Sequence, residues 1–251
     1  MAWLIHLKRL FWAVRVFVLL CGAAFVSVWY LCPFPQARLA QWAVSPMVHD
    51  ATGQIMLGLV SQEDTWRLPV TLEAMSPWVI QATIAVEDKR FFRHSGVDPW
   101  AVIRAVKQNV LARKVVSGAS TLDMQLCRMM DGRDRTLKSK LIESFRALQL
   151  NQLKSKNEIL AFYLNVAPYG GNLHGVEAAA RSYFLKQAKD LTLPEAALIA
   201  GLPQSPTRYR PDKHLARARQ RQHVVLDCML EQGMISSQQW AEAKAFPLVI
   251  D

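Results

Sequence analysis

The sequence contains little of the material from which metal sites and disulfide frameworks are built. It has four cysteines and six histidines among 251 residues. Cys21 and Cys32 belong to an apolar N-terminal run, and Cys127 and Cys228 lie in apolar helical contexts, so we predict four free thiols. No pair of cysteines has metal-site spacing and no H-E-x-x-H occurs, so we expect no metal site made of protein ligands.

The glycine-rich loops of nucleotide-binding proteins are also missing. No G-x-x-x-x-G-K-[ST] occurs, and the glycines between 170 and 175 do not have the spacing of a dinucleotide-binding loop. We interpret residues 158–184 as a helix, a glycine-rich turn and a second helix with a packing role. Residues 193–211 predict a helix followed by a rigid extended segment, because three prolines follow in its second half.

Positive charge is what the sequence has in excess. Thirty Lys and Arg residues stand against 20 Asp and Glu residues, which gives a formal net charge of +10. Such a balance favours an anionic partner, either nucleic acid, anionic lipid or a phosphorylated substrate. Hydrophobic residues make up 51% of the chain and charged residues 20%, which is typical of a folded protein with a core.

The N-terminus predicts a membrane anchor. Residues 10–31 are apolar except for Arg15, and about 20 such residues span a bilayer. Lys8 and Arg9 precede the run, so the positive-inside rule places the N-terminus in the cytoplasm and the later residues outside. The alternative is a cleaved signal peptide, but the run is long for one and no small-x-small site precedes Pro33. A membrane anchor argues against nucleic acid as the partner of the positive charge.

The rest of the chain is expected to be mainly helical. Residues 47–60 ("MVHDATGQIMLGLV") predict a short hairpin or, alternatively, an irregular loop. Helix starts are then indicated by Ser76–Pro77 and by capping boxes beginning at Ser155, Thr192 and Ser236. We therefore divide the chain into a cytoplasmic tail (1–9), a transmembrane helix (10–31), a linker (32–45) and one domain (46–251).

The first stretch that suggests chemistry is "EDKRFFRHSGVD", residues 87–98. If a helix continued past Glu87 and ended near His94, then Glu87, Phe91 and His94 would share one face. A carboxylate beside aromatic rings loses hydration, its pKa rises, and it becomes a better proton acceptor near neutral pH. The alternative is an ordinary carboxylate at a helix end with a satisfied histidine.

Two stretches further on supply hydroxyls and cations. In "SGASTLDMQLCRMM" (117–130), Ser120 and Thr121 would cap a helix whose exposed N–H groups favour an anion, with Arg128 two turns later. In residues 131–148, Arg135 and Lys140 could hold phosphate oxygens. The alternatives are a simple helix cap in the first stretch and a solvated basic face in the second.

Together these motifs resemble the peptidoglycan glycosyltransferase domain of class A penicillin-binding proteins and monofunctional transglycosylases (family 51). Five motifs occur in the family's order over about residues 50–230: "EDKRFFRHSGVD", "GASTLDMQ", "KLIE", "EILAFYLNVAPYGGNLHGVEAAA" and "LPEAALIAGLPQSPTRYRP". Their wording is most similar to the 1C type. The chain shows no S-x-x-K and no K-T-G, so we expect no transpeptidase activity and no acylation by penicillin.

The resemblance implies a mainly α, lysozyme-like fold of two lobes, the smaller one near the membrane. It implies polymerisation of lipid II into β-1,4-linked glycan strands, with inversion and release of polyprenyl pyrophosphate. Glu87 matches the catalytic base and Glu143 the second acid of the donor site. Ser120, Gln125, Arg128, Arg135 and Lys140 match donor and pyrophosphate contacts. From their place in the motifs, Asp88, His94 and Thr121 are also expected at the substrate site.

The resemblance also sets the expected surroundings of the protein. It implies an inner-membrane, single-pass protein with its catalytic domain on the periplasmic or outer side, acting in cell-wall biogenesis and cell shape. Other cell-wall synthesis proteins are candidate partners. No tightly bound cofactor is expected, although some members of the family use a divalent cation, and Mg²⁺ or Mn²⁺ would assist a pyrophosphate leaving group.

The sequence departs from the family's pattern at several positions. Asp123 and Met124 stand where many members have Thr and Gln, and Ser139 and Ile142 stand where many have basic residues. An acid at 123 is expected to repel the pyrophosphate and to weaken activity. This keeps open a non-enzymatic lipid II-binding or scaffold protein. A second alternative is a lysozyme-like enzyme that cleaves glycan, which would need a second carboxylate flanking the bond.

Overall fold

The structure is a computed structural model that describes residues 2–49, 55–114, 118–132, 134 and 136–250. It divides into two compact units, residues 1–36 and 37–251, which are described separately. The first unit is dominated by α1 (Ala2–Leu31), and its stretch Phe11–Leu31 is long and apolar enough to cross a membrane. The helix includes the predicted span and begins earlier, within the predicted cytoplasmic tail.

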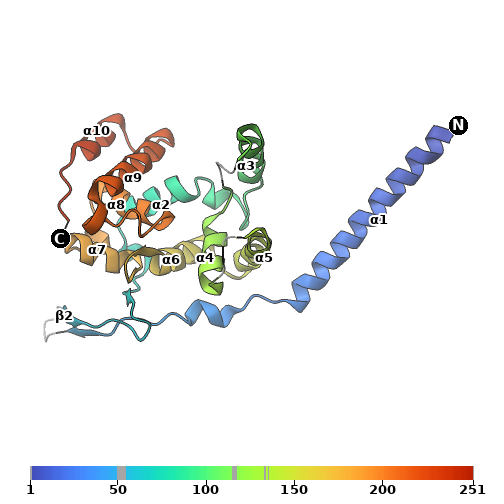
Figure 1. Ribbon diagram of the computed structural model, residues 1–251. Coiled ribbons are helices and arrows are strands. Elements are labelled where there is room, and N and C mark those ends of the chain that lie inside the picture. Colours follow the sequence, from blue (N-terminus) through green and yellow to red (C-terminus); the bar gives the residue numbers. More distant parts are fainter. Residues whose placement is uncertain (1, 50–54, 115–117, 133, 135, 251) are drawn as a thin grey trace. The chain divides into compact units, whose positions relative to one another are not determined.

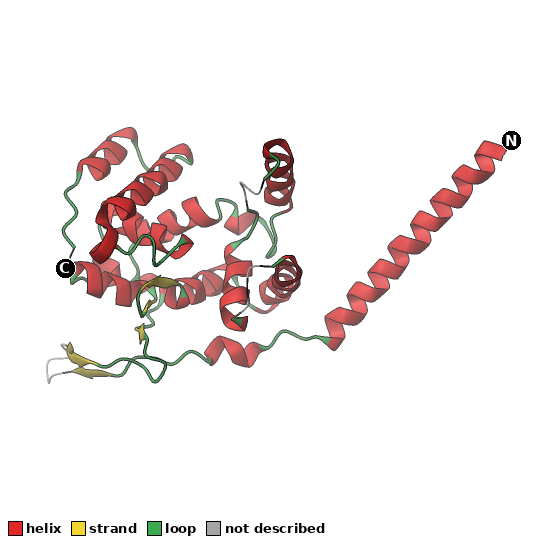
Figure 2. Ribbon diagram, viewed as in Figure 1, coloured by secondary structure: helices red, strands yellow, loops and turns green. Residues whose placement is uncertain are grey.

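The second unit is mainly helical, as Figures 1 and 2 show. Figure 1 shows α2, α8, α9 and α10 gathered at one end of the domain and α3, α4 and α5 at the other. The helices are α2 (Pro77–Glu87), α3 (Pro99–Ala112), α4 (Leu122–Asp131), α5 (Leu137–Leu153), α6 (Lys156–Val166), α7 (Val176–Phe184), α8 (Leu193–Gly201), α9 (Pro211–Glu231) and α10 (Ser237–Ala245). Short 3₁₀ turns lie at Gln36–Ala40, Leu72–Ala74, Phe91–Arg93, Ala188–Asp190 and Leu202–Gln204.

The predicted hairpin is confirmed. Strand β1 (Met47–His49) pairs antiparallel with β2 (Ile55–Gly58), and the connecting residues lie outside the described ranges. A second, three-stranded sheet has the order β3-β5-β4, formed by Trp66–Arg67, Leu173–His174 and Pro168–Gly170. Strand β5 runs parallel to β3 and antiparallel to β4, so the expected glycine-rich turn is itself a small hairpin between α6 and α7.

The helix starts follow the capping signals of the sequence. The Ser76 hydroxyl accepts a hydrogen bond from the N–H of Trp78 at the start of α2. Capping boxes are present at Ser155, Thr192 and Ser236, where they begin α6, α8 and α10. These caps satisfy N–H groups that the helix itself leaves without a partner, which is why local sequence was enough to place these starts.

One helix prediction is wrong. The helix that carries Glu87 does not continue to His94: α2 ends at Glu87, and a turn and a 3₁₀ segment follow. The physical reason lies in Asp88, whose backbone leaves helical geometry at φ −158°. Its carboxylate accepts the N–H of Leu122 and the imidazole of His94, contacts that a continuing helix would not offer. Asp98 does lie on the following turn, where it is the N-cap of α3.

Small side chains let the C-terminal helices pack closely. The core between α2, α8 and α9 includes Ala82, Ala85, Ala197 and Ala200, closed by larger residues from α9. Helix α3 is different, because its buried positions are Ala101 and Ala105, while its large apolar residues such as Trp100, Ile103, Val106, Val110 and Leu111 are exposed.

Candidate functional site

Glu87 lies at the C-terminal end of α2, and its two carboxylate oxygens have different surroundings. Oε2 accepts a hydrogen bond from Nε2 of Gln125 on α4 at 2.9 Å. Oε1 is buried, has no hydrogen-bond partner among the described residues and lies 3.8 Å from Nη2 of Arg221 on α9. The side chain is 11% exposed. One oxygen is therefore held by the protein, while the other remains to accept a proton.

The aromatic rings near Glu87 are tyrosines from a distant part of the sequence. Tyr163 of α6 and Tyr169 of β4 are fully buried. Burial is the main cause that raises the pKa of both phenols, and the negative charge of Glu87 raises it further. Phe91 is also fully buried, but its ring packs against Phe92 and His94. The apolar surroundings expected for the carboxylate are thus provided chiefly by α6 and β4.

Glu87 borders two hollows in the domain surface. One has a volume of about 330 Å³ and is lined by Ser120, Gln125, Arg128 and Arg221, among others. The other has a volume of about 190 Å³, and its lining includes Asp88, Lys89, Arg104, Ser120, Thr121 and Glu231. The structure therefore brings Ser120, Thr121, Gln125 and Arg128 to the surroundings of Glu87, as the motifs predicted. The cations Arg128 and Arg221 make the first hollow suitable for an anion.

Lys140 connects this region to an apolar groove. Its Nζ donates a hydrogen bond to Oγ of Ser120 at 2.9 Å. Lys140 also lines a groove of about 580 Å³ between α3 and α5, whose other walls include Val102, Val106, Leu137 and Leu141. A cation therefore stands where a polar site meets a long apolar surface. The predicted contact Arg135, like Arg133, lies outside the described residues.

Glu143 is placed differently from Glu87. It lies on α5, is 1% exposed and is absent from the linings of both hollows that Glu87 borders. Its predicted part in organising the donor site stays a prediction. Because Glu143 is buried among packed helices, any effect on the donor site would act through neighbouring residues.

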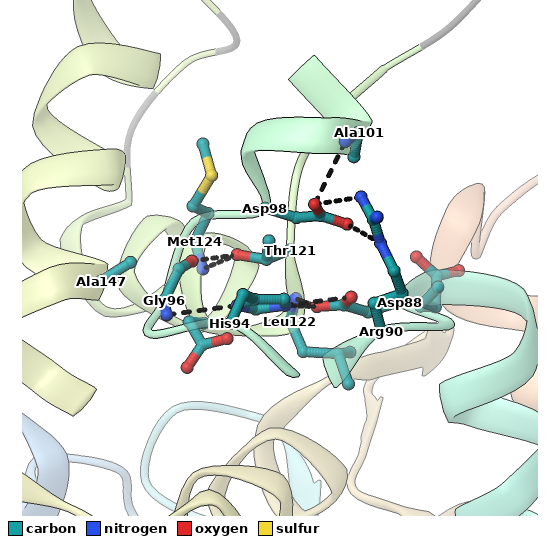
Figure 3. Close-up of polar contacts among 12 residues, drawn as sticks. Asp88, Arg90, His94, Gly96, Asp98, Ala101, Thr121, Leu122, Met124 and Ala147 are labelled. Atoms are coloured by element: carbon teal, nitrogen blue, oxygen red, sulfur yellow. Dashed lines mark hydrogen bonds and ion pairs between the residues drawn. The ribbon is translucent and has the colours of Figure 1, made fainter. Parts of the chain in front are cut away.

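Asp88 and His94 form the centre of a network that holds the loop after Glu87 (Figure 3). The two Asp88 oxygens lie 3.1 and 3.0 Å from Nε2 of His94, and Oδ2 also accepts the N–H of Leu122. Nδ1 of His94 accepts the N–H of Gly96, so the proton of the neutral ring is on Nε2 and is donated to Asp88. Thr121 donates to the carbonyl of Gly96 at 2.6 Å and caps α4. These contacts position the loop, and contact of these side chains with substrate stays a prediction.

The end of the same loop is held by an ion pair. Arg90 donates to both carboxylate oxygens of Asp98, and Asp98 accepts the N–H groups of Trp100 and Ala101 at the start of α3. Burial by itself raises the pKa of Asp98, but the bonds from Arg90 and Ala101 outweigh it, and the net pKa lies below the ordinary value. The carboxylate is therefore charged and fixed at neutral pH.

Asp123 corrects an expectation from the sequence. Its carboxylate is fully buried and lines neither hollow beside Glu87, so it does not face a pyrophosphate there. Nζ of Lys156 lies 3.1 Å from both oxygens, and Asn151 donates to Oδ1. Burial raises the pKa of Asp123, and Lys156 and Asn151 partly oppose that rise. The expected repulsion of a pyrophosphate by Asp123 is wrong, because this side of α4 faces α5 and α6. The residue type alone did not reveal that orientation.

Two of the other departures, Ser139 and Met124, are also placed by the structure. Ser139 is a buried residue of the first turn of α5, where Thr136 caps its N–H and donates to its hydroxyl. Met124 lines the apolar groove together with Lys140. These two residues therefore take part in helix capping and groove lining.

Among the residues that the structure describes, one group could offer three metal ligands. Atoms of Asp88, His94 and Asp123 lie within 4.8 Å of one another. Each already has protein partners, and Lys156 supplies a cation beside Asp123. Nε2 of His94 carries a proton in the tautomer that Gly96 fixes, so the arrangement fits a hydrogen-bonded network better than a metal ligand set.

Comparisons with known proteins identify the family of this chain. The family described as Transglycosylase matches residues 53–230. This chain belongs to the transglycosylase family. The transglycosylase is 44% identical over 183 residues to penicillin-binding protein 1C of Escherichia coli (strain K12), covering 73% of this chain and 24% of that protein. It is 39% identical over 204 residues to penicillin-binding protein 1A of Aquifex aeolicus, covering 81% of this chain and 28% of the relative.

A solved structure confirms the predicted fold. The crystal structure of penicillin-binding protein 1A from Haemophilus influenzae matches this transglycosylase with a TM-score of 0.50 and 25% identity, over 84% of this chain and 22% of that one. The chain spans about a quarter of the length of the relatives it matches. The family predicted from the motifs and the mainly α fold are therefore both confirmed.

Sequence reasoning missed Arg221 and the two tyrosines. Arg221 lies in the basic stretch "ARARQRQH" (216–223), and only the folding of α9 against α2 shows which of its arginines reaches Glu87. Tyr163 and Tyr169 lie within a motif that had been interpreted as packing. A buried tyrosine hydroxyl in such a segment is a signal that a polar group lies nearby.

Proposed function

We propose that this transglycosylase domain polymerises lipid II into β-1,4-linked glycan strands, as an inverting peptidoglycan glycosyltransferase. The observation that carries the proposal is the position of Glu87, which borders a cationic hollow and has one carboxylate oxygen, Oε1, with no hydrogen-bond partner among the described residues. A general base needs an oxygen that is oriented yet able to receive a proton. The hydrogen bond from Gln125 to Oε2 supplies the orientation.

In the proposed reaction, Glu87 removes the proton of the acceptor's 4-hydroxyl as that oxygen attacks the anomeric carbon of the donor. The bond from this carbon to the pyrophosphate oxygen breaks on the opposite face, so an α-linked donor becomes a β-1,4-linked product. Negative charge grows on the leaving pyrophosphate, and fixed cations stabilise it most in the transition state. Arg128, Arg221 and Lys140 are three of the described cations that stand in this region.

The apolar groove supports a polyprenyl substrate. Val102, Val106, Leu137 and Leu141 line it, and Lys140 stands at its polar end, so a chain attached to a phosphate would have both parts matched. The exposed apolar residues of α3 and the apolar stretch of α1 support work at a bilayer. We infer a single-pass inner-membrane protein whose domain lies on the periplasmic or outer side, with lipid II and the growing strand as partners. We also propose the division of the chain predicted from the sequence: a cytoplasmic tail (1–9), a transmembrane helix (10–31), a linker (32–45) and one domain (46–251).

The test is incubation of the purified full chain with lipid II, followed by separation of the products by size. We expect polymer from the wild type and a loss of about 10²–10⁴-fold in kcat for Glu87→Gln, the usual contribution of a general base. Polymerisation by Glu87→Gln at the wild-type rate would refute the mechanism. Release of soluble sugars from intact sacculi would favour a glycan-cleaving enzyme, and lipid II binding without turnover would favour a scaffold.

The same assay tests the metal prediction. Reactions with EDTA, Mg²⁺ and Mn²⁺ measure whether a divalent cation assists departure of the pyrophosphate. We propose that the basic side chains support turnover in EDTA and that an added cation raises the rate. A complete loss of polymer in EDTA, restored by Mg²⁺, would show that the cation is required.

A further inference from the structure

Asp123 is a buried carboxylate with bonded partners on two other helices and a third segment nearby. Lys156 at the start of α6 contacts both of its oxygens at 3.1 Å, and Asn151 of α5 donates to Oδ1. Its carboxylate also lies within 4.8 Å of a carboxylate oxygen of Asp88 and a ring nitrogen of His94, on the loop that follows Glu87. The charge at position 123 therefore connects α4, α5, α6 and that loop.

Helix α4 holds the Glu87 segment at two points. The N–H of Leu122 donates to Oδ2 of Asp88 at 3.1 Å, and Nε2 of Gln125 donates to Oε2 of Glu87 at 2.9 Å. Any shift of the first turn of α4 would move both donors together. The location of the Glu87 carboxylate consequently depends on what holds this turn in place.

Helix α6 supplies that support. Lys156 contacts Asp123. Further along the same helix, the hydroxyl of Tyr163 lies 3.5 Å from Oε1 of Gln125. Residue 123 stands between the two residues of α4 that contact the Glu87 segment. The Lys156 side chain also contacts the Phe91 ring, with its Nζ 4.4 Å from the ring centroid.

We propose that Asp123 and Lys156 are a positioning pair for Glu87: their ion pair holds the first turn of α4 at the place where Leu122 and Gln125 orient Asp88 and Glu87. This rests on the proposed function, because it assigns the pair an effect on that reaction. The pair contributes to the chemical step and not to substrate affinity. The sequence departure that seemed to weaken the site is then part of its support.

The charges in the cluster explain why the two residues depend on each other. Asp88 and Asp123 are two carboxylates in one buried region, and Arg90, the nearby arginine of the loop, is paired with Asp98. Without Lys156, two carboxylates would lie within 4.8 Å of each other with no lysine beside Asp123. Without Asp123, the ammonium of Lys156 would stay beside Phe91 with no carboxylate. In the double variant, neither Asp123 without its lysine nor Lys156 without its carboxylate remains. The loss of kcat in the double variant is therefore smaller than the two single losses predict.

The experiment compares Asp123→Thr, Lys156→Met and the double variant with the wild type on lipid II, with kcat, KM and the melting temperature measured for each. We expect kcat to fall about 10- to 100-fold in each single variant, the scale of a displacement of about 1 Å at a reacting group, with KM nearly unchanged. The double variant is expected to recover part of kcat, a non-additivity typical of contacting residues. Asp123→Asn, which keeps the side-chain shape, serves if Asp123→Thr does not fold.

Lys186→Met is the matched control, because Lys186 also pairs with a buried acid, Glu195, at 2.7 Å. It is expected to lower the melting temperature and leave kcat unchanged. Single variants at 123 and 156 with wild-type kcat would overturn the proposal. So would a loss of kcat in Lys186→Met as large as theirs at a similar fall in melting temperature. A rise in KM with unchanged kcat would also overturn it. If the wild type makes no polymer, the proposed function fails; if the wild type is active and the variants equal it, only this inference fails.

Discussion

Gln125 stands between a buried phenol and the carboxylate of Glu87. Its Nε2 donates to Oε2 of Glu87 at 2.9 Å, and its Oε1 lies 3.5 Å from the hydroxyl of Tyr163. The phenol and the carboxylate together determine which way the amide points, because only its nitrogen can donate to Glu87. This places a fixed donor on Oε2 of Glu87, while Oε1 has no hydrogen-bond partner among the described residues.

Replacing Gln125 with Glu should therefore remove the donor to Oε2 of Glu87 and place a second carboxylate beside it. Two carboxylates at this distance cannot both ionise easily, so they would share a proton. We expect kcat at neutral pH to fall at least about tenfold and the acidic limb of the pH–rate profile to move to higher pH. Gln238→Ala is the control, because Gln238 donates to Glu242 on the exposed helix α10. An unmoved acidic limb in Gln125→Glu would contradict the assignment.

Replacing Arg221 with Gln should remove a fixed cation from beside Glu87 and from the site for the leaving group. Its guanidinium lies 3.8 Å from Oε1 of Glu87 and also donates to the carbonyl of Gly201. Loss of one fixed cation from such a site is expected to lower kcat by about a hundredfold. Arg219→Gln tests the neighbouring arginine of α9, which binds the carbonyls of Lys244 and Phe246. Equal losses in the two variants would show that the effect is structural.

Replacing Gly96 with Ala should destabilise the loop that carries His94. Gly96 has φ +100°, and a Cβ there would lie 2.4 Å from the carbonyl oxygen of Ala147. Strain and the clash together are expected to lower the free energy of unfolding by about 2 kcal/mol or more, measured by urea denaturation. Gly132→Ala is the control, because that position has φ +59° and nothing within 4 Å of the added carbon. A loss no larger than in the control would contradict the predicted clash.

Replacing Asp98 with Asn should remove an acid-sensitive part of the stability. The folded-state pKa of Asp98 lies below its ordinary value, so its charge stabilises the fold fully above the unfolded pKa of about 3.9. That contribution is lost as the pH falls through the folded-state pKa. At pH 7 the free energy of unfolding, measured with urea, should be about 1 kcal/mol larger for the wild type than for Asp98→Asn. This difference should shrink below about pH 4. A difference that stays constant between pH 7 and pH 3 would show that the ion pair with Arg90 is not its source.

The parts of the fold that were predictable from the sequence are those decided locally. The capping boxes at Ser155, Thr192 and Ser236 each involve residues three positions apart, so the pattern alone locates the helix start. The end of α2 was not predictable in this way, because Asp88 is drawn out of the helix by Leu122 and His94, which belong to other segments.

In the candidate site too, the residues within sequence motifs were predictable, and those whose placement depends on tertiary packing were not. Glu87, Ser120, Gln125 and Arg128 were predicted, and the structure places them around the same hollow. The surroundings of Asp123 were predicted incorrectly, since its orientation depends on the packing of α4 against α5 and α6. Arg221 was missed because one arginine among several on α9 is selected by tertiary structure alone.

The pairing of Asp123 with Lys156 also limits how this segment can be exchanged between related proteins. A chimera that takes the α4 sequence from here into a relative without a lysine at the matching position of α6 would bury a carboxylate with no cation beside it. The reverse chimera would leave the ammonium facing the Phe91 ring alone. The two positions therefore have to be transferred as one unit, although 33 residues separate them in the chain.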